Sequence, residues 1–94
     1  MKIENQELRT ESKDNRIKRL LYQSWYRGCK ETDKLLGTFA RQKIHQFSQK
    51  ELDEFEKIMQ EQDWDIWNWV SGKAELPEDL QNNSVMQRLM KFKL

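Results

Sequence analysis

Apolar residues in this chain of 94 residues recur three and four positions apart, and this spacing restricts the fold more than any other feature. It places apolar side chains on one face of an α-helix, whereas a half-buried strand requires strict alternation, which the sequence lacks. One proline and three glycines leave few points at which a helix must end. The pattern therefore predicts an all-α fold, a compact bundle of four or five short helices.

The expected helices follow a flexible lead-in of residues 1–12, where apolar residues are scarce. Residues 13–94 are expected to form a single helical-bundle domain. Ser48 and Glu51 have the spacing of a capping box, and Asp63 is a candidate N-cap. Gly72 is expected to end the helix that follows Asp63. The expected helices cover about 14–27, 30–45, a stretch that begins after Ser48, 64–70 and 83–92.

The charge balance argues against nucleic acid as the partner. Seventeen basic residues oppose sixteen acidic ones, which gives a net charge of +1. Nucleic-acid binders usually have a pronounced basic excess, because their affinity comes largely from neutralising phosphates. Aromatic residues make up 11% of the chain, too many for a disordered one. We therefore expect a folded protein that binds no nucleic acid, and we expect it to be a monomer.

The N-terminal segment and the absence of long apolar runs bear on location. No apolar run approaches the roughly 20 residues of a membrane span, so we expect no membrane insertion. Glu4, Glu7 and Glu11 lie in the first twelve residues, and mitochondrial presequences avoid acidic residues. These observations predict a cytoplasmic protein of bacterial type, with no signal or transit peptide.

Residues for catalysis or metal binding are few. His45 and Cys29 are each the only residue of their type, which excludes a structural zinc site of Cys and His ligands. No glycine-rich phosphate loop is present. The carboxylate pairs at 31/33 and 63/65 are expected by chance in a chain with sixteen acids. We therefore expect no catalytic residue, no metal and no stably bound cofactor.

The stretch "DWDIWNWV" is apolar around more of its circumference than a surface helix needs. Its apolar residues spread over roughly 220°, whereas a stripe of about 100° is enough to cover a core. One interpretation is a short helix wedged between others. The alternative is that Trp69, at the edge of the stripe, faces a partner, since tryptophan is enriched at interfaces.

The stretch "YRGCKETD" contains Gly28 between two expected helices. In a continuous helix Arg27 and Glu31 would form a pair worth about 0.3–0.5 kcal/mol, while an interior glycine costs about 1 kcal/mol. Gly28 is therefore expected either to adopt a positive φ or to allow another backbone to approach closely. With Arg27 and Glu31 pointing outward, this turn is a candidate docking site.

Four stretches together resemble the succinate dehydrogenase assembly factor (flavinator) family, whose hallmark is an Arg-Gly-x-x-Glu motif. They are "KRLLYQSWYRGCKETD", "LLGTFA", "DWDIWNWV" and "NSVMQRLMKF", and the resemblance covers residues 16 to about 92. By position, Arg27, Gly28 and Glu31 match the motif, with Asp33 as its companion. The sequence departs from the family pattern at Cys29, where methionine is common, and at Trp25, Tyr26 and Thr32.

The resemblance implies a small helical bundle that binds the flavoprotein subunit of succinate dehydrogenase and promotes covalent attachment of FAD to a histidine of that subunit. Bacterial members also act on the related fumarate reductase subunit. FAD would then be the cofactor of the client, not of this chain. The implied partner-binding residues are Arg27, Gly28, Glu31 and Asp33, to which the helix analysis adds Trp69.

Other functions stay open from the residues alone. A small helical DNA-binding or antitoxin-like interaction protein fits the size and the helices but not the near-neutral charge. An enzyme using Glu31 and Asp33 would need a pocket that short helices rarely enclose. A carrier that stacks FAD on surface tryptophan and arginine side chains is a third alternative.

Overall fold

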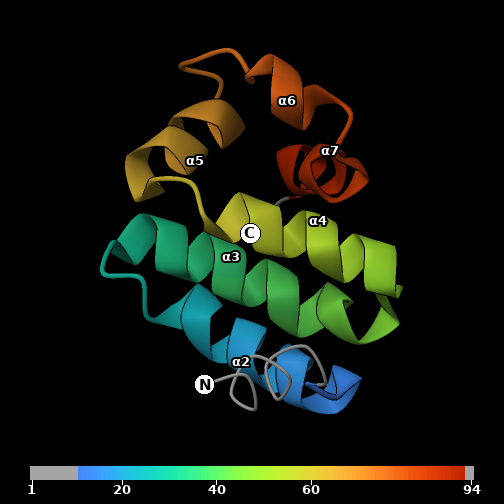
Figure 1. The fold of residues 1–94 in the computed structure, drawn as a ribbon. Helices are drawn as coiled ribbons and strands as arrows, with labels where there is room; N and C mark the ends of the chain where they lie inside the picture. The colour runs from blue at the N-terminus through green and yellow to red at the C-terminus, as the bar shows by residue number, and fades with distance from the viewer. Residues whose placement is uncertain (1–10, 93–94) are drawn as a thin grey trace, which may run out of the picture.

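The structure, a computed structural model, describes residues 11–92 (Figure 1). Within this range the chain contains helices and no strand, so the prediction of an all-α fold is confirmed. Five α-helices have eight residues or more, and one short α-helix and a 3-10 helix link them. The elements are α2 (Lys13–Trp25), α3 (Lys30–Lys43), η1 (Ile44–Gln46), α4 (Gln49–Met59), α5 (Asp63–Val70), α6 (Glu78–Gln81) and α7 (Ser84–Lys91).

The helices form two groups on either side of α4 (Figure 1). On one side α2 and α3 run in opposite directions and pack along each other, joined by a short turn. On the other side α7 packs on α4, and α5 bridges α3 and α7. The turn between α2 and α3 and the link between α4 and α5 consequently lie at the same end of the molecule.

The core lies where these helices meet, and aromatic rings form its centre. The ring centroid of Phe39, in α3, lies 6.2 Å from the ring centroids of both Phe47 and Phe55. The ring of Phe92 packs edge-on against Phe39, with a centroid distance of 5.3 Å. Aliphatic residues from every α-helix of the described range surround this group. The fully buried members include Leu20, Leu36, Ile44, Leu52, Ile58, Ile66, Leu80, Met86 and Leu89.

Local capping explains where several helices begin and end. Ser48 accepts from the Glu51 N–H at 3.2 Å and the Glu51 carboxylate accepts from the Ser48 N–H at 2.8 Å, so the predicted capping box is confirmed. Gly72 has a φ of +85° and ends α5, as expected. The sequence pattern did not identify Ser12, which caps α2 by accepting from the Asn15 N–H at 3.1 Å.

Asp63 is not the N-cap of α5. That position belongs to Gln62, and Asp63 is the first residue of the helix. Its carboxylate instead accepts a hydrogen bond from Nε of Arg27 at 2.6 Å. In addition, the second helix is shorter than expected, because residues 44–46 tighten into the 3-10 turn.

Two other expectations relate to the limits of the described range. The expected lead-in of residues 1–12 falls almost entirely on residues that the structure does not describe, apart from Glu11 and Ser12. Across residues 11–92, no helix has the length and apolar character required to cross a membrane.

Candidate functional site

The turn between α2 and α3 depends on Gly28. Its φ of +105° lies in the left-handed region that side chains disfavour, which confirms the prediction of a positive φ. A Cβ at this position would meet no atom within 4 Å. The glycine is therefore required by the backbone conformation, and the space beside its Cα is open to an approaching partner.

Asp33, in the first turn of α3, fixes the backbone of the Gly28 turn through hydrogen bonds. Its carboxylate accepts hydrogen bonds from the N–H groups of Arg27, at 2.9 Å, and of Gly28, at 3.3 Å. Cys29 is the N-cap of α3 but makes no capping bond with its side chain. Asp33 thus satisfies the backbone donors of the turn and is part of its internal structure.

Arg27 points into the protein, so the expectation that it points outward is wrong. Its Nε donates to Oδ1 of Asp63 at 2.6 Å, and its Nη1 and Nη2 donate to the carbonyls of Met59 at 2.8 Å and Glu61 at 2.5 Å. Only 12% of the side chain is exposed. The carbonyls at the end of α4 lack helical partners, and the guanidinium fork satisfies them.

Thr32 adds a second tie between the same elements. It is fully buried, and its hydroxyl donates to the carbonyl of Asp63 at 3.0 Å. The Arg27 side chain and Thr32 therefore join the Gly28 turn and the start of α3 to the start of α5. This joint is the structural setting of the Arg-Gly-x-x-Glu motif.

Glu31 is the charged residue of the motif that faces solvent. It forms no ion pair with Arg27, whose guanidinium is already bound to Asp63. The nearest polar side-chain contact is the Cys29 thiol, which donates to Oε1 of Glu31 at 3.5 Å. Cys29 itself is half-buried. The structure therefore offers a carboxylate and a bare glycine backbone on the exposed side of the turn.

Trp69 is buried in the core with 7% of its surface exposed. The expectation that it faces a partner is not met, because Trp69 belongs to the core of the bundle and α5 packs against both α3 and α7. The exposed tryptophan is Trp64, at 58%, directly after Asp63. Periodicity could not separate the two, since both lie on the apolar arc of the same short helix.

A cleft of about 500 Å³ opens beside the turn. Tyr22 and Tyr26 lie along one side, 66% and 70% exposed, with ring centroids 4.7 Å apart. The end of α4 and residues 60–63 form the other side, with Arg27 between them. The cleft is therefore continuous with the Gly28 turn through Arg27 and Tyr26.

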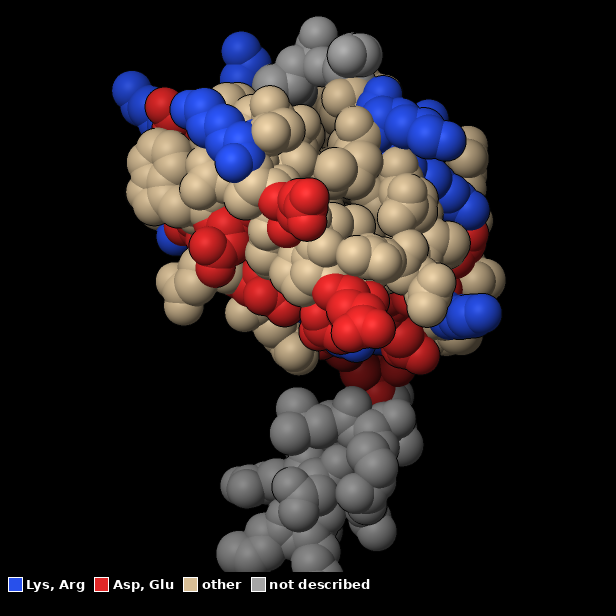
Figure 2. All heavy atoms as spheres, turned by 90° about the horizontal axis from the view of Figure 1, so that it is seen from above, with Lys and Arg blue, Asp and Glu red and all other residues tan. Residues whose placement is uncertain are grey.

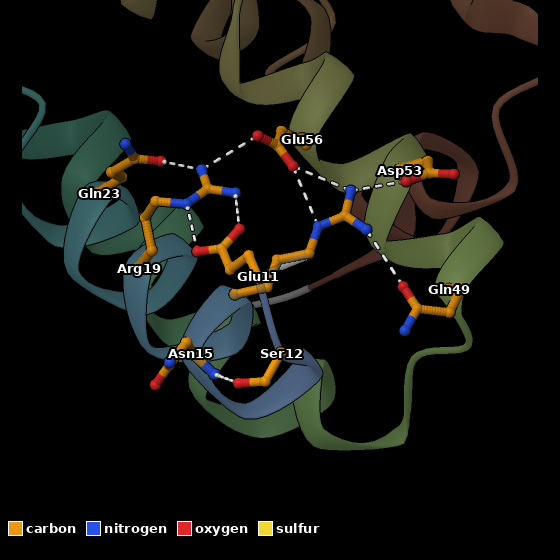
Figure 3. A network of polar contacts seen from close by, with 9 residues as sticks. Glu11, Ser12, Asn15, Arg19, Gln23, Gln49, Asp53 and Glu56 are labelled. Carbon is orange, nitrogen blue, oxygen red and sulfur yellow. Dashed lines mark hydrogen bonds and ion pairs between the residues drawn. The ribbon is translucent and has the colours of Figure 1, made fainter. Parts of the chain in front are cut away.

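A network of ion pairs joins α2 to α4 along the same side of the molecule (Figure 3). Arg16 donates to Glu56 at 2.9 Å and to Asp53 at 2.6 Å, and Arg19 donates to the other Glu56 oxygen at 3.0 Å. Burial alone would raise the pKa of Glu56, but the hydrogen bonds from the two arginines outweigh it and lower this pKa. Glu11 also has a lowered pKa, because Arg19 donates to it twice.

Charges of both signs cover the face that Figure 2 shows. Acidic side chains gather in its middle and lower part, and basic side chains lie mainly along the upper and right margins. A continuous basic surface of the kind that binds nucleic acid is not seen on the described residues of this face. Among residues 11–92, no cluster of three His, Cys, Asp or Glu side chains could hold a metal ion.

The fold and the site define a small helical bundle with a preformed turn, an exposed carboxylate and exposed aromatic side chains. The family model described as "Flavinator of succinate dehydrogenase" matches residues 18–93. The chain belongs to this family, and its resemblance to the succinate dehydrogenase assembly factors is confirmed.

Individual relatives agree with this assignment. The protein named succinate dehydrogenase assembly factor 2, mitochondrial, of Debaryomyces hansenii is 41% identical over 92 residues, which are 95% of this chain and 65% of that protein. The protein of the same name from Schizosaccharomyces pombe is 40% identical over 82 residues, 87% of this chain and 59% of its own length. The chain thus spans about six tenths of these two relatives. Because the relatives are named assembly factors, the comparisons support the prediction of a non-catalytic protein.

The prediction of a cytoplasmic, bacterial-type location is contradicted. The relatives from Debaryomyces hansenii, Schizosaccharomyces pombe and Mycosarcoma maydis are all named mitochondrial. The prediction relied on the acidic residues within positions 1–12. Since the chain spans only part of its relatives, the composition of those positions does not determine the compartment.

Proposed function

We propose that this protein binds the flavoprotein subunit of succinate dehydrogenase and promotes covalent attachment of FAD to that subunit. It holds no FAD as a cofactor of its own and contributes no catalytic group. The observation that carries the proposal is the Gly28 turn, which is exposed, has open space beside its Cα and is held rigid by Asp33. The client backbone packs against this glycine, and the Glu31 carboxylate accepts hydrogen bonds from the client.

A binding protein can accelerate a reaction in its client without supplying reactive groups. Covalent flavin attachment to a histidine requires the flavin and the imidazole to be held in reacting geometry. Raising such an arrangement from about 1% of the population to most of it requires roughly 3 kcal/mol of preferential binding. Exposed aromatic residues and a charged hydrogen bond at one interface are enough to supply this energy.

We propose the flavoprotein subunit of fumarate reductase as a second client, on the basis of the resemblance to bacterial members of the family. The same experiment tests it with the other subunit in place of the first.

The test measures covalent flavin on the client. The flavoprotein subunit from the same organism is incubated with FAD, with and without this protein, then denatured and separated on a gel. We expect flavin fluorescence at the subunit band to rise with the wild-type protein. We expect a much smaller rise with Gly28→Leu, because a side chain fills the space that the client backbone needs.

Gly72 provides a matched control for backbone strain. It also has a positive φ, and a Cβ there would also meet no atom within 4 Å. Gly72→Leu should therefore be destabilised by a similar amount, about 1–2 kcal/mol, but should keep its effect on the client. Glu31→Ala should lower the effect, while Ala at the exposed Glu75 should not.

Two results would contradict the proposal. If the wild-type protein leaves the fluorescence of the subunit band unchanged, the proposed function is wrong. If the leucine variants at positions 28 and 72 lose the effect equally, the loss reflects stability, and the Gly28 turn is not the contact.

A further inference from the structure

We infer that Arg27 is a positioning residue, which holds the Gly28 turn and the start of α5 together as one client-facing surface, and that Trp64 is a contact on this surface. The inference rests on the proposed function and extends it. It assigns the motif arginine an internal role and adds a contact residue outside the motif.

The bonds of Arg27 reach every element that borders the site. Its backbone N–H is bound by Asp33 of α3, and its guanidinium binds Asp63 of α5 together with the carbonyls of Met59 and Glu61. The position of the turn relative to the start of α5 is therefore set largely by one side chain. Thr32 supports it with a single bond.

A direct contact between the Arg27 guanidinium and the client is disfavoured by the same geometry. With 12% of the side chain exposed, little of it can meet another protein. To reach outward it would have to leave a carboxylate and two backbone carbonyls, and a partly buried carboxylate without its partner is costly. Arg27 therefore affects client binding indirectly, by fixing the position of the turn and of α5.

Exposed aromatic residues mark the surface that Arg27 organises. Within residues 11–92 the large apolar side chains that are mostly exposed are Tyr22, Tyr26 and Trp64. Tyr26 directly precedes Arg27 and stacks on Tyr22, and Trp64 directly follows Asp63. Aromatic residues of this kind carry much of the binding energy at protein interfaces. The surface thus fits an apolar patch of the flavoprotein that also presents a donor to Glu31.

The test compares two arginines that each clamp helices together. Arg16 is a matched control, because it is 17% exposed and its guanidinium binds Glu56, Asp53 and Gln49. Arg27→Gln and Arg16→Gln should lose similar stability in urea. Affinity for the client subunit, measured by titration, should fall at least about tenfold for Arg27→Gln and stay within about twofold for Arg16→Gln.

Amide hydrogen exchange reports on the turn itself. The Gly28 N–H is bound by Asp33, so its exchange should accelerate in Arg27→Gln and not in Arg16→Gln. Arg27→Lys, which keeps the charge but not the fork, should lie between wild type and Arg27→Gln in affinity. It serves in place of Arg27→Gln if that variant does not fold. Trp64→Ala should lower affinity about tenfold with little change in stability, and Trp64→Phe should keep most of it.

The outcomes distinguish a positioning role of Arg27 from a direct contact with the client, and they test Trp64 separately. Equal affinities for the two glutamine variants would overturn the positioning role. A loss of affinity in Arg27→Gln with unchanged exchange at Gly28 would make Arg27 a direct contact and overturn it as well. Unchanged affinity in Trp64→Ala would remove Trp64 from the surface. If the wild-type protein does not bind the client at all, the proposed function fails. Accelerated exchange of the Gly28 N–H in Arg27→Gln would still support the role of Arg27 in holding the turn.

Discussion

Replacing Gly37 by alanine should not stabilise this protein, although alanine is the better helix former. Gly37 lies within α3, where the indole of Trp25 packs against the helix backbone. A Cβ on Gly37 would come within 3.0 Å of three atoms of that ring. The guanidinium of Arg41 lies over the same ring, 4.9 Å from its centroid, so the indole is held on α3 by two residues.

The expected magnitude follows from two opposing terms. Alanine in place of glycine in a helix interior gains about 1 kcal/mol. Forcing a methyl group into a filled site costs about 1–3 kcal/mol. In the wild-type background Gly37→Ala should therefore lower the free energy of unfolding by up to about 2 kcal/mol. In a Trp25→Ala background the ring is gone, and the same substitution should raise it by about 1 kcal/mol.

A double-mutant cycle measures this change of sign. The four proteins are unfolded in urea, followed by far-UV circular dichroism, and the coupling energy is calculated from the four free energies of unfolding. We expect a coupling of about 1–3 kcal/mol, equal to the packing cost. If Gly37→Ala has the same effect in both backgrounds, Trp25 does not pack on Gly37 and the reasoning is refuted.

Three further predictions concern stability. Despite its partial burial, Glu56 has a folded-state pKa below its ordinary value of 4.5, because it is paired with Arg16 and Arg19. The stability that this carboxylate adds to the fold is therefore present above pH 4.5 and is lost as the pH falls through the lower folded-state pKa. Glu56→Gln should consequently make the stability in urea fall less steeply with decreasing pH. Ser48→Ala should cost about 1 kcal/mol in the same urea assay, because it removes half of the capping box, and no change would contradict that role. Thr32→Val should cost about 1 kcal/mol in urea and should accelerate amide exchange at Gly28 if the hydroxyl helps to hold the turn.

Features that depend on neighbours in the sequence could be predicted well. The capping box at Ser48 requires only residues three apart, and the helix end at Gly72 and the positive φ of Gly28, one of its two expected roles, follow from glycine next to a helical pattern. Helical periodicity likewise located the five longer α-helices of residues 11–92, because apolar residues recur three and four positions apart in them. These features are local, so one sequence is enough to find them.

The internal role of Arg27 could not be predicted, because its partners are distant in sequence. Asp63 is 36 positions away and Met59 is 32. In the sequence Arg27 is adjacent to a turn, where arginine is normally solvated, and nothing there shows that the end of α4 will supply carbonyl groups. Trp69 poses the same difficulty, since its burial depends on how α3 and α7 flank α5.

Under the proposed function, the arrangement around Gly28 allows a site with few contacting groups to bind the client. A turn that was mobile before binding would lose conformational freedom in the complex, and that loss would be subtracted from the affinity. Here Asp33 fixes the backbone of the turn, and Arg27 and Thr32 fix the elements beside it. Most of the ordering therefore occurs when the protein folds. Substitutions that loosen this framework should consequently weaken binding even where the altered side chain never touches the client.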